Sequence, residues 1–216
     1  MRTRSRQNGF TLVELLTAIA VVAVLGAILV PVLSSSRTKT ELVQSTSNVR
    51  QIGVAALTFA QDNDGELPVW HDYRDGIQQY WWQILRPYAG SDNNIFGSPA
   101  HEEFDPTNDG TVAATISYGW NYVVMGRHKG DSAFDGDHVG TQWLYPNPSE
   151  TLVLTDGPKT DSWGYIDHTG HSADPERYDG KTVALFLDGR AEVKPVETFL
   201  VEDPYFLSPK DLPGSN

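Results

Sequence analysis

Apolar residues dominate the start of the chain. Positions 10–33 hold a single charged side chain, Glu14, and residues 15–33 are 19 mostly apolar positions. A helix that crosses a bilayer needs about 20 such residues, so the run predicts a transmembrane helix. The segment before it is rich in arginine, and basic residues favour the cytoplasmic side of a membrane. We therefore expect a cytoplasmic N-terminus and an extracytoplasmic remainder.

After this run, the apolar residues keep helical spacing but fall on only one face of the expected helix. Apolar and small residues recur at steps near three, four and seven, at Leu42, Val49, Ile52, Gly53, Ala56, Phe59 and Ala60. The spacing predicts an amphipathic continuation of the helix over residues 34–62. Proline removes a backbone donor, so we expect a kink at Pro31. Asn63-Asp64-Gly65 with Pro68 should end the helix, which leaves residues 63–216 as a head.

The head pattern predicts one short helix and several strands. The helix is expected over residues 77–88, with Trp82 pointing away from its apolar face. Residues 89–114, 125–150 and 156–180 have the composition of loops. Strands are expected at residues 115–124, 151–155, 181–187 and 190–196. The fold class that follows is α+β, with a long helix packed on an antiparallel sheet.

Asp188-Gly189 separates the last two expected strands. Asp-Gly between alternating runs is a strong signal for a two-residue type I′ turn, in which both central residues need positive φ. The sequence therefore predicts a structural hairpin at Asp188 and Gly189.

Charge and cysteine content narrow the possible functions. The formal net charge is −12, and removal of residues 1–9, with their three arginines, would leave 13 basic and 28 acidic residues, or −15. Such a charge repels phosphate backbones, so we expect no nucleic-acid partner. The chain has no cysteine and hence no disulfide or thiol chemistry.

The segment Gly9-Phe10-Thr11-Leu12-Val13-Glu14 resembles the processing site of type IV prepilins and type II secretion pseudopilins. The resemblance implies a leader peptide at residues 1–9, a transmembrane and assembly helix at residues 10–33, and cleavage after Gly9. It also implies methylation of Phe10 and pairing of Glu14 with the Phe10 amine of another subunit. A lone carboxylate in a membrane helix costs about 2.5 to 3.5 kcal/mol, so a partner is expected. An ordinary signal peptide would be cut after the apolar run, whereas Gly9 precedes it.

The head is similar to prepilin-like proteins described by an H-X9-DG region. The matching pieces, in order, are residues 48–53, 62–68, 116–121, 148–152 and 185–189. Two positions depart from the pattern. Tyr178 stands ten residues before Asp188, where the pattern has histidine, and Ser98-Pro99 stands where relatives often have Cys-Pro.

Metal and catalytic sites find little support in the sequence. His168 and His171 are spaced like helical ligands near Asp167 and Asp174, but Gly170 and the loop composition argue against a preformed zinc site. A calcium loop begun at Asp131 would place Ala133 and Gln142 at ligand positions, and one framed on Asp64-Gly65 would begin with Ala60. The sequence has no Gly-x-Ser-x-Gly elbow, so we expect no enzyme and no cofactor.

The resemblance implies a pilin-like structural subunit in the inner membrane. Its expected partners are a prepilin peptidase and methyltransferase, other pilin or pseudopilin subunits, an inner-membrane assembly platform and membrane lipid. The alternative is a tethered module that binds envelope carbohydrate through tryptophan side chains. The candidates are Trp70, Trp82, Trp143 and Trp163.

Overall fold

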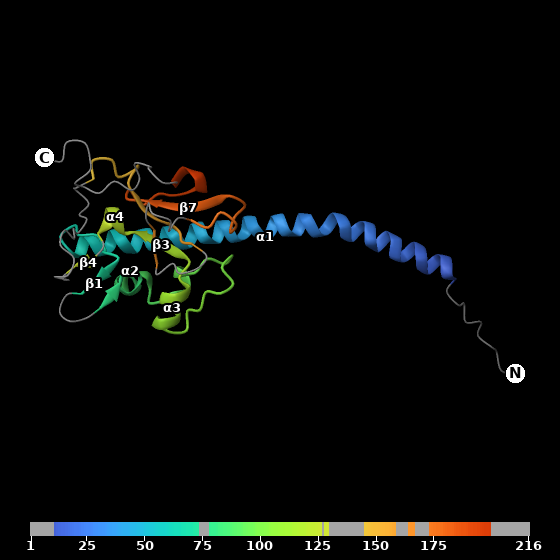
Figure 1. Ribbon diagram of the computed structural model, residues 1–216, viewed down its shortest axis with the longest axis horizontal. Helices are drawn as coiled ribbons and strands as arrows, with labels where there is room; N and C mark the ends of the chain where they lie inside the picture. Colours follow the sequence, from blue (N-terminus) through green and yellow to red (C-terminus); the bar gives the residue numbers. More distant parts are fainter. Residues whose placement is uncertain are drawn as a thin grey trace. The chain divides into compact units, whose positions relative to one another are not determined.

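The computed structural model describes residues 11–73, 78–126, 128–129, 145–158, 164–166 and 173–199. The chain forms two compact units, residues 1–40 and residues 41–216. Helix α1 (Leu12–Asp62) is continuous through both (Figure 1).

The first unit contains the apolar half of α1. Its large apolar side chains, from Leu12 to Leu33, are all more than half exposed. The helix is long and apolar enough to cross a membrane. It runs 51 residues and continues through Pro31. The predicted long helix with an apolar first half is confirmed.

The end of α1 is set by local chemistry in the second unit. The Gly65 amide donates to the Ala60 carbonyl at 2.7 Å, and Asp64 and Gly65 have φ values of 51° and 81°. Residues that tolerate positive φ close a helix by such a bond. The predicted stop after Asp62 is therefore correct.

The main sheet has five strands in the order β6-β3-β5-β7-β8. The strands are β3 (Tyr118–Asn121), β5 (Leu152–Asp156), β6 (Tyr165–Ile166), β7 (Lys181–Phe186) and β8 (Ala191–Pro195). All neighbours pair antiparallel except β3 and β6, which are parallel. The α+β fold is confirmed, and the expected antiparallel sheet is corrected to a mixed one.

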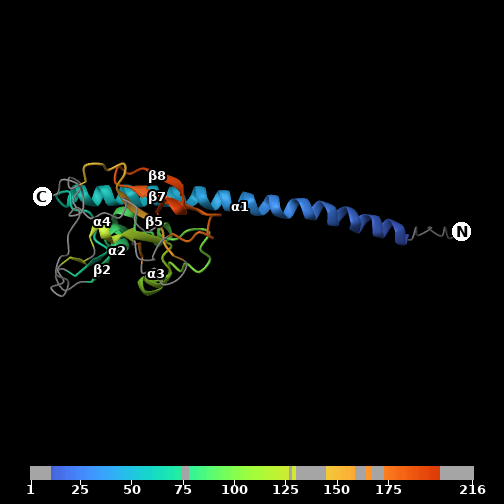
Figure 2. The same cartoon turned by 45° about the horizontal axis from the view of Figure 1, so that its top comes forward.

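Short elements surround this sheet (Figure 2). A second sheet has the order β2-β1-β4. Its strands are β1 (His71–Asp72), β2 (Gln79–Tyr80) and β4 (His128–Lys129). The short helices are α2 (Trp81–Leu85), η2 (Arg86–Ala89), η3 (Asn93–Phe96), α3 (Asp109–Thr115), α4 (Tyr122–Met125) and η5 (Val196–Phe199).

Two local predictions are wrong in this region. Residues 89–114 hold η3 and most of α3, and the strand predicted over 115–124 is shortened by α3 before it and α4 after it. An asparagine starts each of these two helices: Asn108 accepts a hydrogen bond from the Thr111 amide at the start of α3, and Asn121 accepts one from the Val124 amide at the start of α4. Asparagine is a favoured N-cap, and here its capping overrides the strand pattern.

Trp82 also differs from its prediction. It is buried at 1% exposure, with its ring 6.3 Å from that of Phe96. The short η3 helix supplies Phe96 and thereby covers a side chain that was expected to point outward.

The core lies between the second half of α1 and the main sheet. Val49, Ile52 and Ala56 of α1 share one buried cluster with Val153 and Leu185 of the sheet. A Cβ added at Gly53 would lie 2.7 Å from the Leu185 side chain, so this glycine allows close approach of helix and strand. The predicted apolar face of α1 therefore packs on the sheet.

The β7–β8 hairpin has a different turn from the predicted one. The Gly189 amide donates to the Phe186 carbonyl at 2.9 Å, and Gly189 has a φ of 84°. Asp188 is not among the residues with positive φ. The type I′ assignment is therefore wrong: three residues, 187–189, form the loop, and only Gly189 is left-handed, as in the common three-residue hairpin.

Candidate functional site

The N-terminus of α1 carries a reciprocal capping arrangement. Thr11 precedes the first helical residue, and its amide and hydroxyl both donate to Glu14 Oε2, at 2.9 and 2.8 Å. The Glu14 amide donates back to Thr11 Oγ1 at 3.2 Å. This is a capping box, which pairs amide donors that a helix start otherwise leaves unsatisfied.

Among the predicted N-terminal residues, the structure describes Glu14, whereas Gly9 and Phe10 lie outside the described residues. Sequence analysis did not identify Thr11 as the residue that caps α1. The signal was present, since Thr-x-x-Glu before an apolar run is the pattern of a capping box.

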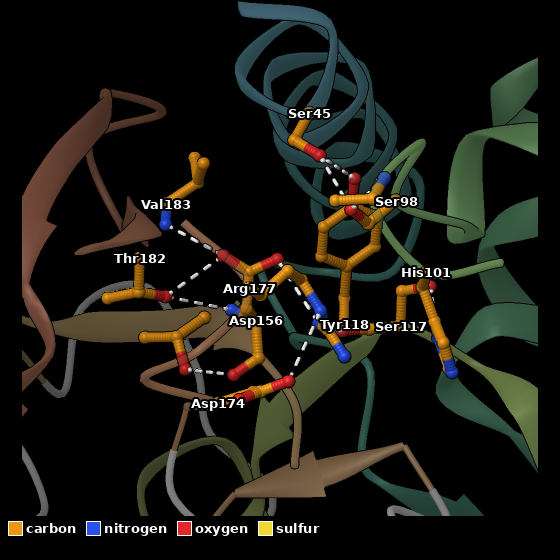
Figure 3. Close-up of polar contacts among 12 residues, drawn as sticks. Ser45, Ser98, His101, Ser117, Tyr118, Asp156, Asp174, Arg177, Thr182 and Val183 are labelled. Carbon is orange, nitrogen blue, oxygen red and sulfur yellow. Dashed lines mark hydrogen bonds and ion pairs between the residues drawn. The ribbon is translucent and has the colours of Figure 1, made fainter. Parts of the chain in front are cut away.

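A second polar site is a ring of buried hydroxyls in the head (Figure 3). Tyr178 OH contacts both Ser45 Oγ, at 2.5 Å, and Ser98 Oγ, while Ser45 donates to Ser98 at 3.2 Å. Tyr118 OH donates to Ser45 Oγ at 3.0 Å. We call Ser45, Ser98, Tyr118 and Tyr178 the hydroxyl cluster. It joins α1, the segment after η3, β3 and the segment before β7.

Burial governs the electrostatics of the hydroxyl cluster. Burial raises the pKa of the Tyr178 phenol to about 12, and the nearby Asp156 charge acts in the same direction. Burial also raises the pKa of the Tyr118 phenol well above its ordinary value. Both phenols are therefore neutral hydrogen-bonding groups at neutral pH.

A buried ion pair lies beside the hydroxyl cluster (Figure 3). Arg177 Nη1 lies 3.5 Å from Asp156 Oδ1, and Arg177 Nε lies 3.9 Å from Asp174 Oδ2. The Val183 amide and the Thr182 hydroxyl donate to Asp156 Oδ2 at 2.9 and 3.1 Å. Burial raises the pKa of the Asp156 carboxyl, although Arg177 and these donors oppose the shift. The hydrogen bonds link β5 to β7, and the ion pair links β5 to the segment that precedes β7.

The two positions that depart from the H-X9-DG pattern meet in this region. Ser98 and Tyr178 contact each other directly, and both are at most 3% exposed. These two positions, distant in the sequence, are therefore in direct contact. Ser45 and Asn48 had a sequence signal too, because they are polar residues on the apolar face of α1.

A serine–histidine contact occurs nearby, but its serine hydroxyl is closed to a substrate. His101 Nδ1 lies 2.9 Å from Ser117 Oγ, and Ser117 is 0% exposed. A nucleophile must be reached by its substrate, and this hydroxyl is enclosed. The contact therefore fits a structural hydrogen bond.

Most of the residues that the sequence analysis weighed and rejected as metal ligands lie outside the described part of the chain. Asp174 is buried against Arg177, whereas Asp167, His168 and His171 lie outside the described residues, as do Asp131, Ala133 and Gln142. Within the described ranges, no three histidine, aspartate or glutamate side chains are grouped as a metal site would require.

The tryptophans named for the alternative carbohydrate-binding hypothesis are mostly enclosed or lie outside the described residues. Trp82 is buried, and Trp70 packs against Tyr165, with ring centroids 5.0 Å apart. Trp143 and Trp163 lie outside the described residues. Sugar binding usually needs an open aromatic face, which neither described ring offers in full.

One polar depression of about 420 Å³ lies between residues 44–51 of α1 and residues 92–104. Amide and carboxylate side chains line much of it, including Gln44, Asn48 and Asp92. Asn48 is already engaged, because its amide donates to the Gly97 carbonyl at 3.0 Å.

Comparison with known protein families gives one match. Residues 4–30 match the family model described as the prokaryotic N-terminal methylation motif. No curated protein and no solved structure matches the chain. At its N-terminus the chain is thus like a type IV prepilin or pseudopilin, and the motif indicates a structural subunit. Together with a single N-terminal apolar helix, it suits a single-pass inner-membrane protein.

Proposed function

We propose that this protein is a structural subunit of a type IV pilus or a type II secretion pseudopilus. It would be made as a precursor, cut after Gly9 and assembled through α1. The observation that carries the proposal is the methylation motif over residues 4–30, which overlaps a helix with exposed apolar side chains.

The exposed apolar half of α1 needs an apolar environment. Contiguous apolar surface of this extent marks an interaction with lipid or with protein. Lipid satisfies it in the membrane, and neighbouring helices satisfy it in a filament, where packing replaces lipid contacts. Assembly therefore moves α1 from one apolar surrounding to another.

Glu14 would fix how far each α1 helix is shifted along its neighbour in the filament. An unpaired carboxylate is costly in an apolar bundle, and an opposite charge offsets that cost. The Phe10 amine of a neighbouring subunit would supply the charge once the leader is removed. The partners of this step are a prepilin peptidase and methyltransferase, other pilin-like subunits and an inner-membrane assembly platform.

The proposal predicts a mature chain that begins with N-methylated Phe10. Mass spectrometry of protein extracted from the native membrane measures this directly. Gly9→Val is the matched control: a side chain next to the scissile bond should block cleavage and leave the leader attached. A wild-type N-terminus at Met1, or one beyond Leu33, would contradict the proposal.

A further inference from the structure

We propose that the polar depression between α1 and residues 92–104 binds a neutral saccharide. Its volume of about 420 Å³ lies within the range of about 300 to 1,000 Å³ that small-molecule sites occupy. All of its lining residues belong to the second unit, residues 41–216. The proposal therefore concerns the head alone and goes beyond assembly through the N-terminal half of α1.

One wall of the depression is a row of carboxamides on α1. Gln44, Asn48 and Gln51 follow one another at steps of four and three residues, so they lie on one face of the helix. Gln44 and Gln51 are exposed, whereas Asn48 is buried. A carboxamide has two donors and an acceptor oxygen, so this wall can both donate to a hydroxyl and accept from it.

Asn48 is the buried polar group of this wall, at 7% exposure. Its Nδ2 donates to the Gly97 carbonyl at 3.0 Å, whereas its Oδ1 accepts no hydrogen bond from any described residue. A side chain buried to this extent usually has partners for its polar atoms. The Oδ1 atom of Asn48 is therefore an acceptor that a bound hydroxyl would satisfy.

The opposite wall adds a carboxylate that is held in place. Asp92 Oδ1 accepts from the amide and from the side-chain Nδ2 of Asn94, at 2.9 and 2.7 Å. Asp92 Oδ2 accepts no hydrogen bond from any described residue. The first oxygen orients the side chain, and the second is available to accept from a ligand hydroxyl.

An aromatic ring supplies the apolar part of the lining. The ring of Phe104 lies against the backbone of Gly97, because a Cβ added at Gly97 would overlap Phe104 Cδ1. Phe104 packs on the main core cluster and is only partly buried. The C–H groups of a sugar ring can pack against its exposed part.

The chemistry of the lining selects the class of ligand. Asp92 is the one ionisable side chain among the described lining residues, so no lysine or arginine there can pair with an anion. Small-molecule sites are mostly lined by apolar groups, and a lining rich in carboxamides instead favours a ligand rich in hydroxyls. Each hydroxyl of a saccharide can donate and accept, which matches both kinds of group in this wall. A peptide backbone has one donor and one acceptor per residue and matches fewer of them.

The test titrates the full-length chain with neutral disaccharides. The protein is kept in micelles of dodecylphosphocholine, a detergent without a sugar headgroup. Saturation-transfer-difference NMR follows the binding of cellobiose, maltose, lactose and chitobiose, and trialanine is the peptide probe. The variants are Gln44→Leu and Asp92→Asn. Gln61→Leu is the matched control, because Gln61 is an exposed glutamine of α1 that does not line the depression.

We expect at least one disaccharide to bind the wild-type protein with a millimolar Kd. Gln44→Leu and Asp92→Asn should each raise that Kd about five-fold, the effect of one lost hydrogen bond, and Gln61→Leu should leave it unchanged. The melting temperature should be the same in all three variants, since both glutamines are exposed and asparagine keeps an oxygen that can accept from the Asn94 amide.

Three results would overturn the proposal. The first is the absence of saturation transfer from all four disaccharides. The second is a wild-type Kd in both Gln44→Leu and Asp92→Asn, because the sugar would then bind elsewhere. The third is binding of trialanine in place of the disaccharides, which would assign the depression to an extended peptide. Each would leave the proposed function standing, because that function is tested at Phe10.

Discussion

Individual polar side chains in the core of the head are stabilised by one another. Burying a hydroxyl without a partner costs free energy, whereas a paired hydroxyl is nearly neutral or favourable. The three hydroxyls of Ser45, Ser98 and Tyr178 can each donate once around a closed ring, and Tyr118 donates into it. The hydroxyl cluster is therefore self-sufficient in a region closed to solvent.

The buried phenols predict alkaline sensitivity. The pKa of Tyr178 is about 12 in the folded protein, against about 10 for an unfolded tyrosine. The folded state thus keeps a proton that the unfolded chain releases, so stability is complete below pH 10 and falls as pH rises toward 12. One tyrosine contributes a slope of up to about 1.4 kcal/mol per pH unit.

Tyr178→Phe should reduce that slope, and denaturant unfolding of the detergent-solubilised protein between pH 9 and pH 12 measures it. At pH 7 the same variant should lose about 1 kcal/mol, because its hydroxyl partners lose a hydrogen bond. A wild-type unfolding free energy that stays constant from pH 10 to pH 12 would contradict the assignment.

Single residues also show what the sequence could and could not predict. Glu14 was identifiable because it is the one charge in an apolar run. The partners of Tyr178 were not, because they lie 133 and 80 residues away in the chain. A polar residue on an apolar helix face, such as Ser45, indicates a buried network but does not identify its members.

At the scale of elements, periodicity predicted the long helix and the strands of the sheet best. Helix α1 extends far enough for its apolar spacing to be unambiguous, and β5, β7 and β8 have clear strand composition. The short α3 and α4 helices were missed because each depends on one capping asparagine rather than on a repeated pattern. The parallel β6 has only two residues, too few to give a pattern.

The β7–β8 hairpin predicts a contrast between two neighbouring substitutions. Gly189→Val should destabilise by about 1 to 3 kcal/mol, because Gly189 has a φ of 84° and a β-branched residue is strained there. The new Cβ would also lie 3.1 Å from the Leu57 side chain. Thermal unfolding followed by circular dichroism measures the loss.

Asp188→Asn is the matched control for this turn. Asparagine can still accept from the Arg190 amide, which lies 3.0 Å from Asp188 Oδ1, and loses only an exposed ion pair with Arg190. Its cost should stay below about 1 kcal/mol. If it abolished function at an unchanged melting temperature, the carboxylate would have a chemical role and the structural interpretation would fail.

At the scale of the whole molecule, the two units differ in whether their apolar side chains are exposed or buried. The apolar half of α1 exposes its side chains, whereas the second half, from Ser45 onward, supplies buried residues to the head. Residues 36–216 contain 13 basic and 27 acidic residues, a net charge of −14. This part has its own core and a strongly acidic composition.

The fragment 36–216 should therefore be folded and soluble without detergent. It keeps the α1 residues that cover the sheet and omits the apolar run. Its circular dichroism should show helix and strand, and it should not bind duplex DNA at about 0.15 M salt, where phosphate contacts are already weakened. An unfolded fragment, or one that binds DNA tightly, would refute this division of the chain.

The direct contact between Ser98 and Tyr178 has an evolutionary consequence. A ring of hydroxyls that closes only when both are present makes the effect of a substitution at one position depend on the residue at the other. Replacing either alone would leave a buried group to find a new partner, so the two sites should vary together among relatives.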